Sequence, residues 1–243
     1  IPAVKWYDGT EFLLVEARIG SVSDESELPP SKPAQIFYDD STQEYKRSVF
    51  WDISTSIYTG TSISTQDSEP TDIEWKPDGT RLFEVGKAGD NIYEYDVSTP
   101  WDISTAGYTG TKISTQDIEP TGIAWKPDGT RLFEVGKSSD KIYEYDVSTP
   151  WDISTATYTG TSTNTYGIRP RDIAWKSDGT RLFTVTSNLD EIYEYDVSTP
   201  WDISTAGYTG TSISTQDSEP TGSPWKVDGP LLFEEGNINH IIH

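Results

Sequence analysis

The sequence predicts an all-β protein, and three observations support this class. A unit of 50 residues recurs from Trp51 to Pro200 and begins again at Trp201, and residues 51–100 and 101–150 agree at 41 of 50 positions. Within each unit, apolar and polar residues alternate over short runs, as expected for half-buried strands. No segment keeps the helical period of about 3.6 residues long enough to form a helix. Four short antiparallel strands in a repeat of about 50 residues are typical of a β-propeller blade.

The first half of the repeat is expected to form two strands joined by a tight turn. Residues 71–75 alternate, with Ile73 and Trp75 on one side, and form the first strand. Residues 76–80 contain Pro-Asp-Gly, which favours a type I turn followed by a left-handed glycine. Residues 81–85, Arg-Leu-Phe-Glu-Val, form the second strand, so this half of the repeat is a β-hairpin.

The second half of the repeat supplies two more strands. Residues 86–90 form a loop, and residues 92–97 alternate again as the third strand. Residues 98–105, Ser-Thr-Pro-Trp-Asp-Ile-Ser-Thr, form a connecting loop with room for one helical turn. Residues 108–115 are rich in Thr and Ser, as expected of a solvated edge strand.

Five copies of the repeat can be recognised by the Trp of the first strand. These residues are Trp6, Trp75, Trp125, Trp175 and Trp225. In the first copy, strands are expected within residues 4–15 and 35–38, and a Ser-, Pro- and acid-rich insert at about residues 19–34 enlarges the loop between them. The repeats cover approximately residues 1–64, 70–114, 120–164, 170–214 and 220–243. We predict one β-propeller domain over residues 1–243 with five blades, the last incomplete, or six or seven blades if the chain is a fragment.

The turn motif resembles that of a known family. Pro-Asp-Gly-Thr at residues 77–80 and 127–130, followed by Arg-Leu-Phe-x-Val, resembles the signature of bacterial YVTN and TolB-like (PD40-type) propellers. The resemblance covers most of each repeat and implies the fold, but such propellers host unrelated activities. The Trp-Asp pairs, as at residues 101–102, open a loop and lack a preceding Gly-His, so the repeat is not of the WD40 type.

Composition limits the classes of partner. The net charge is −22 and the pI is about 4.2, which argues against nucleic acids and anionic membranes, because both bind clustered Lys and Arg. There is no Cys, and His occurs only at positions 240 and 243, so a thiolate nucleophile, a His-based triad and a zinc site are not expected. No apolar run approaches the roughly 20 residues that span a bilayer. We expect a secreted, cell-surface or periplasmic protein, although the chain has no targeting signal.

No cofactor is expected. Calcium is the one alternative, because acidic loops attract cations, but Ca²⁺ needs about six to eight oxygen ligands and the Asp-x-Glu segments supply few. No phosphate-binding loop, nucleophile elbow or dinucleotide fingerprint is present.

Repeats 3 and 4 differ mainly in two loops, and both are candidates for ligand binding. Gln-Asp-Ile-Glu-Pro-Thr at residues 116–121 becomes Tyr-Gly-Ile-Arg-Pro-Arg at 166–171, and Gly-Lys-Ser-Ser at 136–139 becomes Thr-Ser-Asn-Leu at 186–189. The geometry of the resembled family implies that these connections, between repeats and between the second and third strands, lie on one face. The alternative is that the loop sequences differ only because loops tolerate substitutions, whereas the turns that are needed for folding do not. The predicted ligand-binding residues are Gln66, Asp67, Glu69, Asp90, Gln116, Asp117, Glu119, Asp140, Arg169, Arg171, Asp190, Gln216, Asp217 and Glu219.

A Glu in the middle of the second strand is a candidate for burial. Glu84, Glu134 and Glu234 stand where repeat 1 has Leu14 and repeat 4 has Thr184. Burial would raise the pKa of such a carboxyl unless it is paired. We expect structural pairing, with the Arg that opens the same strand or the Lys after the first-strand Trp, rather than catalysis by paired carboxylates.

The sequence therefore favours a non-catalytic binding or scaffold propeller. The most specific hypothesis is multivalent carbohydrate binding. Trp and Tyr stack on sugars, and carboxylates and amides form hydrogen bonds with sugar hydroxyls. Repeated weak sites also gain avidity. One alternative is a hydrolase of the lactonase or glycosidase type, with carboxylates at the channel mouth. Another is a structural repeat within a larger surface or viral protein. The expected partner is a glycan or another small polar ligand.

Overall fold

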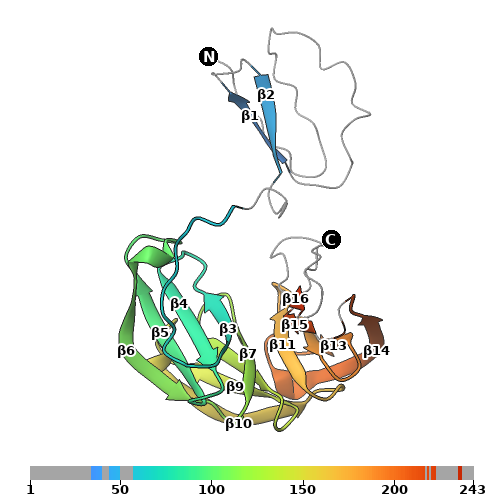
Figure 1. Cartoon of the computed structure of the whole chain (residues 1–243). Helices are drawn as coiled ribbons and strands as arrows, with labels where there is room; N and C mark the ends of the chain where they lie inside the picture. Colours follow the sequence, from blue (N-terminus) through green and yellow to red (C-terminus); the bar gives the residue numbers. More distant parts are fainter. Residues whose placement is uncertain are drawn as a thin grey trace, which may run out of the picture. The chain divides into compact units, whose positions relative to one another are not determined.

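The structure is a computed structural model of the chain that describes residues 34–39, 44–49, 57–216, 218, 220–222 and 235–236 (Figure 1). The chain divides into two compact units, Ile1–Gly60 and Thr61–His243. The first unit contains an antiparallel hairpin of β1 (Ala34–Asp39) and β2 (Glu44–Val49). The predicted strand at residues 35–38 lies inside β1 and is confirmed, whereas β2 was not predicted.

The remaining expectations for the first repeat are not tested. The strands expected within residues 4–15 and the insert at residues 19–34 lie outside the described residues. The single domain and the number of five blades stay predictions.

The second unit contains three complete four-stranded antiparallel sheets, which we call blades 2, 3 and 4 after their repeats. Blade 2 consists of β3 (Pro70–Trp75), β4 (Arg81–Gly86), β5 (Asn91–Val97) and β6 (Ala106–Ser114). Blade 3 consists of β7 (Pro120–Trp125), β8 (Arg131–Gly136), β9 (Lys141–Val147) and β10 (Ala156–Asn164). Blade 4 consists of β11 (Pro170–Trp175), β12 (Arg181–Thr186), β13 (Glu191–Val197) and β14 (Ala206–Ser214). The predicted four strands per repeat are confirmed, and the fold is an all-β propeller.

The first strands of the blades are neighbours in space. β3 packs beside β7, and β7 packs beside β11 (Figure 1). β15 (Pro220–Gly222) pairs with β16 (Glu235–Gly236) and packs against β11 and β12. Each outer strand is the solvated edge that its Thr and Ser content predicts, as the mostly exposed β6 illustrates. Within the described parts of the chain, no helix has the length and apolar character needed to cross a membrane.

Aromatic side chains form the core between the blades. Phe133 of blade 3 is fully buried, and its ring centroid lies 4.7 Å from that of Trp175 and 6.4 Å from that of Trp201, both in blade 4. Phe83 of blade 2 makes the same contacts with Trp125 and Trp151 of blade 3, at 4.7 and 6.4 Å. Two Trp from different parts of a repeat therefore enclose one Phe of the preceding repeat, which explains how a chain with few aliphatic residues builds a core.

The loop before the fourth strand contains the one helical turn that was expected. It is the 3₁₀ helix η3 (Ile103–Thr105) in blade 2, with equivalents η4 (Ile153–Thr155) and η5 (Ile203–Thr205). In η3, the Asp102 side chain accepts a hydrogen bond from the backbone N–H of Ser104, as an N-cap does. The Trp-Asp pair of each repeat therefore begins a short capped turn.

Candidate functional site

The variable loops of each blade lie together on one face, as predicted. Asp67, before the first strand of blade 2, accepts hydrogen bonds from the backbone N–H groups of Ala88 (3.1 Å) and Gly89 (2.9 Å), between the second and third strands. On the other side, the backbone N–H of Trp101 donates to the carbonyl of Gly79 at 3.0 Å. The two turns that hardly change between repeats, one before the second strand and one before the fourth, therefore also contact each other. We call the side formed by the variable loops the loop face and the opposite side the turn face.

Asp67 and Asp117 are buried in the loop face, at 3% and 2% exposure. Asp67 also accepts a hydrogen bond from the backbone N–H of Glu69 at 2.8 Å. Burial opposes ionisation, but the backbone donors outweigh it and hold the pKa of Asp67 below its ordinary value. Its carboxylate thus joins the two variable loops of one blade. Asp117 does the same in blade 3, where it accepts from the backbone N–H of Ser139 at 2.9 Å.

Glu84 and Glu134, in the second strands, are buried at 1% and 0% exposure. They accept hydrogen bonds from the backbone of the loop that precedes the first strand of the same blade. Glu134 accepts hydrogen bonds from the backbone N–H groups of Gln116 (2.9 Å) and Asp117 (2.8 Å), and a further one from the hydroxyl of Tyr145. Burial raises the pKa of Glu134 to about 7. The expected structural role is supported, but the expected Arg or Lys partner is wrong. Backbone amides and a tyrosine take that place.

The Arg that opens the second strand has another partner. Arg81 pairs with Glu94 at 3.0 Å and with Asp96 at 3.3 Å. Glu234, in the fifth repeat, lies outside the described residues.

In blade 4 the buried Asp is absent, and the neighbouring positions change with it. A Cβ at Gly136 would overlap the Asp117 side chain, so Asp needs Gly beside it in blade 3. In blade 4, Thr186 replaces that Gly, and a Cβ at Gly167 would lie 2.7 Å from the Thr186 methyl carbon. The repeats thus pair Asp with Gly or Gly with Thr at these two positions, whereas Asp with Thr would overlap.

The change in blade 4 leaves an exposed aromatic residue on the loop face. Thr184 replaces the buried Glu, and the Tyr195 hydroxyl accepts a hydrogen bond from the backbone N–H of Tyr166 at 2.7 Å. The Tyr166 side chain is 62% exposed, yet its ring stacks on that of Tyr208 with centroids 3.9 Å and planes 26° apart. A third ring, Tyr193, lies 5.3 Å from it. Tyr166 is thus both accessible and held in place.

Basic and apolar residues occupy the same two loops as Tyr166 and its neighbour across the blade. The Arg171 Nε donates to the Ser187 Oγ at 2.9 Å, and the backbone N–H of Arg169 donates to the Asp140 carboxylate of blade 3 at 2.6 Å. Within residues 57–216, no ion pair involves either guanidinium. Leu189 is also exposed here. We call this set the blade-4 platform: Tyr166, Ile168, Arg169, Arg171 and Leu189.

The other predicted site residues are placed as follows. Gln66, Gln116 and Glu69 are exposed on the loop face, and Glu119 is half-buried. Asp90, Asp140 and Asp190 have φ values of +49°, +55° and +54°, a left-handed conformation that Asp tolerates in loops. Gln216 is described, whereas Asp217 and Glu219 lie outside the described residues. A ligand-binding role for these residues remains a prediction.

Three carboxylates on the first strands were missed by the sequence analysis. Asp72 and Glu74 lie on β3, and Asp172 lies on β11. Burial first, and then Asp172 and Glu74, raise the pKa of Asp72 well above its ordinary range. Burial and the charge of Asp172 raise the pKa of Glu74 to about 8. Comparison of the repeats could have indicated these carboxylates, because repeat 2 has Asp and Glu where repeat 3 has Gly122 and Ala124.

These carboxylates also connect neighbouring blades. The Asp72 Oδ2 accepts a hydrogen bond from the backbone N–H of Ile123, in blade 3, at 2.9 Å. A Cβ at Gly122 would lie 2.9 Å from the Asp172 Oδ1, so the absence of a side chain in blade 3 lets Asp172 approach. Among the described residues, no three His, Asp or Glu side chains form a group that could hold a metal ion.

We expect the free energy of unfolding to decrease as the pH rises through the pKa of Glu74. Because this pKa is about 8 when folded against an ordinary 4.5, the extra stability is complete below about pH 4.5 and declines progressively as the pH rises to about 8. Glu74→Gln should flatten this dependence, as measured by urea unfolding at several pH values. Glu119→Gln, on the loop face, serves as the control. Identical profiles for the wild type and Glu74→Gln would contradict the assignment.

No protein-family profile matches the chain, and no curated protein matches it. The resemblance to YVTN and TolB-like propellers is therefore not confirmed at the family level. Solved structures do match. A protein from Bacteroides uniformis, described as a candidate 6-phosphogluconolactonase, has a TM-score of 0.53 at 12% identity, over 86% of this chain and 58% of that one. This likeness supports the propeller fold.

Two further structures match less well. Hydrazine synthase of Kuenenia stuttgartiensis has a TM-score of 0.49 at 22% identity, over 74% of this chain and 45% of that one. The periplasmic gluconolactonase of Pseudomonas aeruginosa has a TM-score of 0.44 at 13% identity, over 60% of this chain and 40% of that one. The chain thus spans between 40% and 58% of the length of these three proteins.

Proposed function

We propose that the protein is a non-catalytic binding propeller that recognises a glycan on the loop face of blade 4. The observation that supports this most is Tyr166, whose ring is 62% exposed while it is stacked on Tyr208. A large ring that is already immobilised loses little entropy when a ligand covers it. The apolar side of a sugar ring is a suitable partner for such a surface.

The charged groups of the platform favour a sugar that carries a carboxylate. Arg169 and Arg171 follow Tyr166 by three and five residues in the chain, and a guanidinium binds a planar carboxylate with two parallel hydrogen bonds. Asn188 and Ser187, in the adjoining loop, offer amide and hydroxyl groups to sugar hydroxyls. An acidic glycan, such as one that contains uronic acid residues, fits this combination. An extracellular or periplasmic location is part of the proposal.

The proposal assigns binding to blade 4 and not equally to every blade. In blades 2 and 3 the Asp67 and Asp117 carboxylates already accept several backbone hydrogen bonds, so they have little capacity left for a ligand. Blade 4 has Gly167 at this position and presents Tyr166 instead of Gln. The exposed Gln and Glu residues of the other blades could extend the contact with a long glycan.

Tyr166→Ala should weaken binding of an acidic glycan by about tenfold, which corresponds to ~1.4 kcal/mol and is typical of a lost aromatic contact. The ligand would first be found on a glycan array, and affinity would then be measured by titration calorimetry. Ile118→Ala is the matched control, because Ile118 is 68% exposed at the equivalent loop of blade 3 and lies outside the platform. Equal affinities for Tyr166→Ala and the wild type would contradict the proposal.

A hydrolase is the second candidate, and Glu74 is the reason for it. A carboxyl with a pKa of about 8 remains protonated at neutral pH and can serve as a general acid. The Bacteroides uniformis neighbour carries the name of a lactonase, although at 12% identity it supports only the fold. If this candidate is right, the chain should hydrolyse sugar lactones, Glu74→Gln should abolish the activity, and Tyr166→Ala should retain it.

A further inference from the structure

The blades are joined on the turn face by a contact that recurs with the same geometry. The Arg that opens the second strand of one blade donates a hydrogen bond to the backbone carbonyl of the Trp in the next blade's turn. The Arg81 Nη1 donates to the Trp151 carbonyl at 2.8 Å, and the Arg131 Nη1 donates to the Trp201 carbonyl at 2.8 Å. The contact is thus a repeated feature of the fold.

A second hydrogen bond holds the same turn two residues later. The backbone N–H of Ile153 donates to the Glu94 Oε2 at 3.1 Å, and that of Ile203 donates to the Glu144 Oε2 at 3.3 Å. Each Glu side chain is also paired with the Arg of its own blade and is only 4% exposed. An Arg and a Glu together therefore form a seat for the Trp-Asp-Ile-Ser-Thr turn of the next blade.

Occupied seats bury the turn that they hold. Ile153 and Ile203 are fully buried, and Trp151 and Trp201 are 8% and 9% exposed. The turn of blade 2, whose Trp carbonyl accepts from no Arg among the described residues, has a Trp101 that is 58% exposed. Burial of this Trp therefore accompanies contact with the preceding blade and does not follow from the turn alone.

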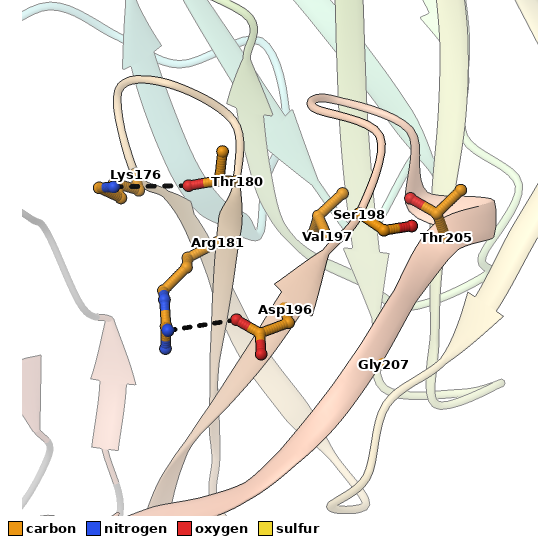
Figure 2. A pocket seen from close by; sticks show the side chains of 8 residues that line it. All are labelled: Lys176, Thr180, Arg181, Asp196, Val197, Ser198, Thr205 and Gly207. Carbon is orange, nitrogen blue, oxygen red and sulfur yellow. Dashed lines mark hydrogen bonds and ion pairs between the residues drawn. The ribbon is translucent and has the colours of Figure 1, made fainter.

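Blade 4 has the same Arg and Glu, but no turn among the described residues occupies its seat. Arg181 pairs with Glu194 and Asp196, as its counterparts do. The Glu194 side chain is 25% exposed, against 4% in each occupied seat, and that of Arg181 is 40% exposed. Figure 2 shows the pocket of about 600 Å³ at this place. It is lined by Lys176, Thr180, Arg181, Asp196, Val197, Ser198, Thr205 and Gly207.

We infer that this pocket is a docking site for a further Trp-Asp-Ile-Ser-Thr turn, in addition to the turns that the structure describes. The occupied seats show which groups the ligand must present: a Trp carbonyl for Arg181 and, two residues later, a backbone N–H for Glu194. A short capped turn presents both, whereas an extended strand would point its carbonyl and N–H groups differently. The recognition would resemble the completion of a blade by a peptide, with main-chain hydrogen bonds giving affinity and the Trp giving specificity.

A peptide with the sequence of residues 148–156, Ser-Thr-Pro-Trp-Asp-Ile-Ser-Thr-Ala, tests the inference. Calorimetric titration into the chain of residues 1–243 should show one binding site. Arg181→Ala should weaken binding at least about tenfold, as expected when a hydrogen bond from a charged group is lost. Lys112→Ala, which removes an exposed charge from blade 2, should leave the affinity unchanged.

Two peptide variants test the geometry without altering the protein. Methylation of the Ile backbone nitrogen removes the donor for Glu194 and should weaken binding at least about tenfold. Replacing the peptide Trp by Ala should do the same. Far-UV circular dichroism of Arg181→Ala establishes that it folds. The inference is overturned if the parent peptide does not bind, which would also be the result if the protein's own chain covers the seat, or if all peptides bind equally.

Discussion

Replacing Glu134 by Ala should lower the free energy of unfolding by about 3–5 kcal/mol, because it leaves several buried hydrogen-bond donors without an acceptor, each at a cost of about 1–3 kcal/mol. The substitution leaves the backbone N–H groups of Gln116 and Asp117 and the hydroxyl of Tyr145 without their acceptor inside the protein. Water cannot readily replace it, because Glu134 is fully buried. Urea unfolding at pH 6, followed by circular dichroism, measures the loss.

Blade 4 provides the matched control, because there the residues equivalent to Asp117, Glu134 and Gly136 are all different. Gly136→Thr alone should be destabilising, because the new side chain overlaps Asp117. The triple variant Asp117→Gly, Glu134→Thr and Gly136→Thr copies the residues of blade 4 and should be more stable than either Gly136→Thr or Glu134→Ala. If the three destabilising effects simply add, the residues do not act as one unit and our interpretation is wrong.

Phe133→Ala should cost about 3–5 kcal/mol, as is typical for a fully buried Phe, and should weaken the contact between blades 3 and 4. The ring is 0% exposed and lies between Trp175 and Trp201 of the next blade. Its removal leaves a cavity at the inter-blade interface, and the two Trp rings lose an apolar neighbour. Thermal and urea unfolding, with Trp fluorescence as the probe, would report both the stability and the environment of these rings.

The equivalent substitution in blade 4 is the control. Phe183 is half-buried, whereas Phe83 and Phe133 are fully buried, although the three residues occupy the same position of the repeat. Phe183→Ala should therefore cost less than Phe133→Ala. Equal costs would mean that the difference in burial between the two rings contributes little to stability.

Much of the fold could be predicted from the repeat, because its local signals agree with one another. The alternation at residues 71–75 and 92–97 predicted β3 and β5, and Pro-Asp-Gly predicted the tight turn in which Gly79 adopts a φ of +71°. The strand β2 was not predicted, because Glu-Tyr-Lys-Arg-Ser-Val is polar and departs from the repeat.

The candidate site was predictable only in part. Comparison of repeats located Arg169 and Arg171 on the loop face correctly, because a residue that departs from a nearly invariant repeat is visible when the repeats are aligned. The same comparison could not separate Asp67 from Glu69, which differ in burial and not in chemistry. Asp72 was missed because its raised pKa depends first on burial and then on Asp172, 100 residues away in the sequence.

The period, the order of strands and turns, and the places where one copy differs from another can all be read from the amino-acid order alone. Alternation and turn residues are local signals, because each influences the backbone of only a few neighbouring residues. Only the tertiary structure decided which polar groups are used up and which remain available. The Asp117 carboxylate already accepts hydrogen bonds from backbone amides, and Tyr166 is exposed on a stack of rings. No described turn occupies the Arg181 seat, whereas the two seats before it are filled. Burial and hydrogen-bond satisfaction depend on contacts between blades, and near-identical repeats acquire different roles from the neighbours that they meet.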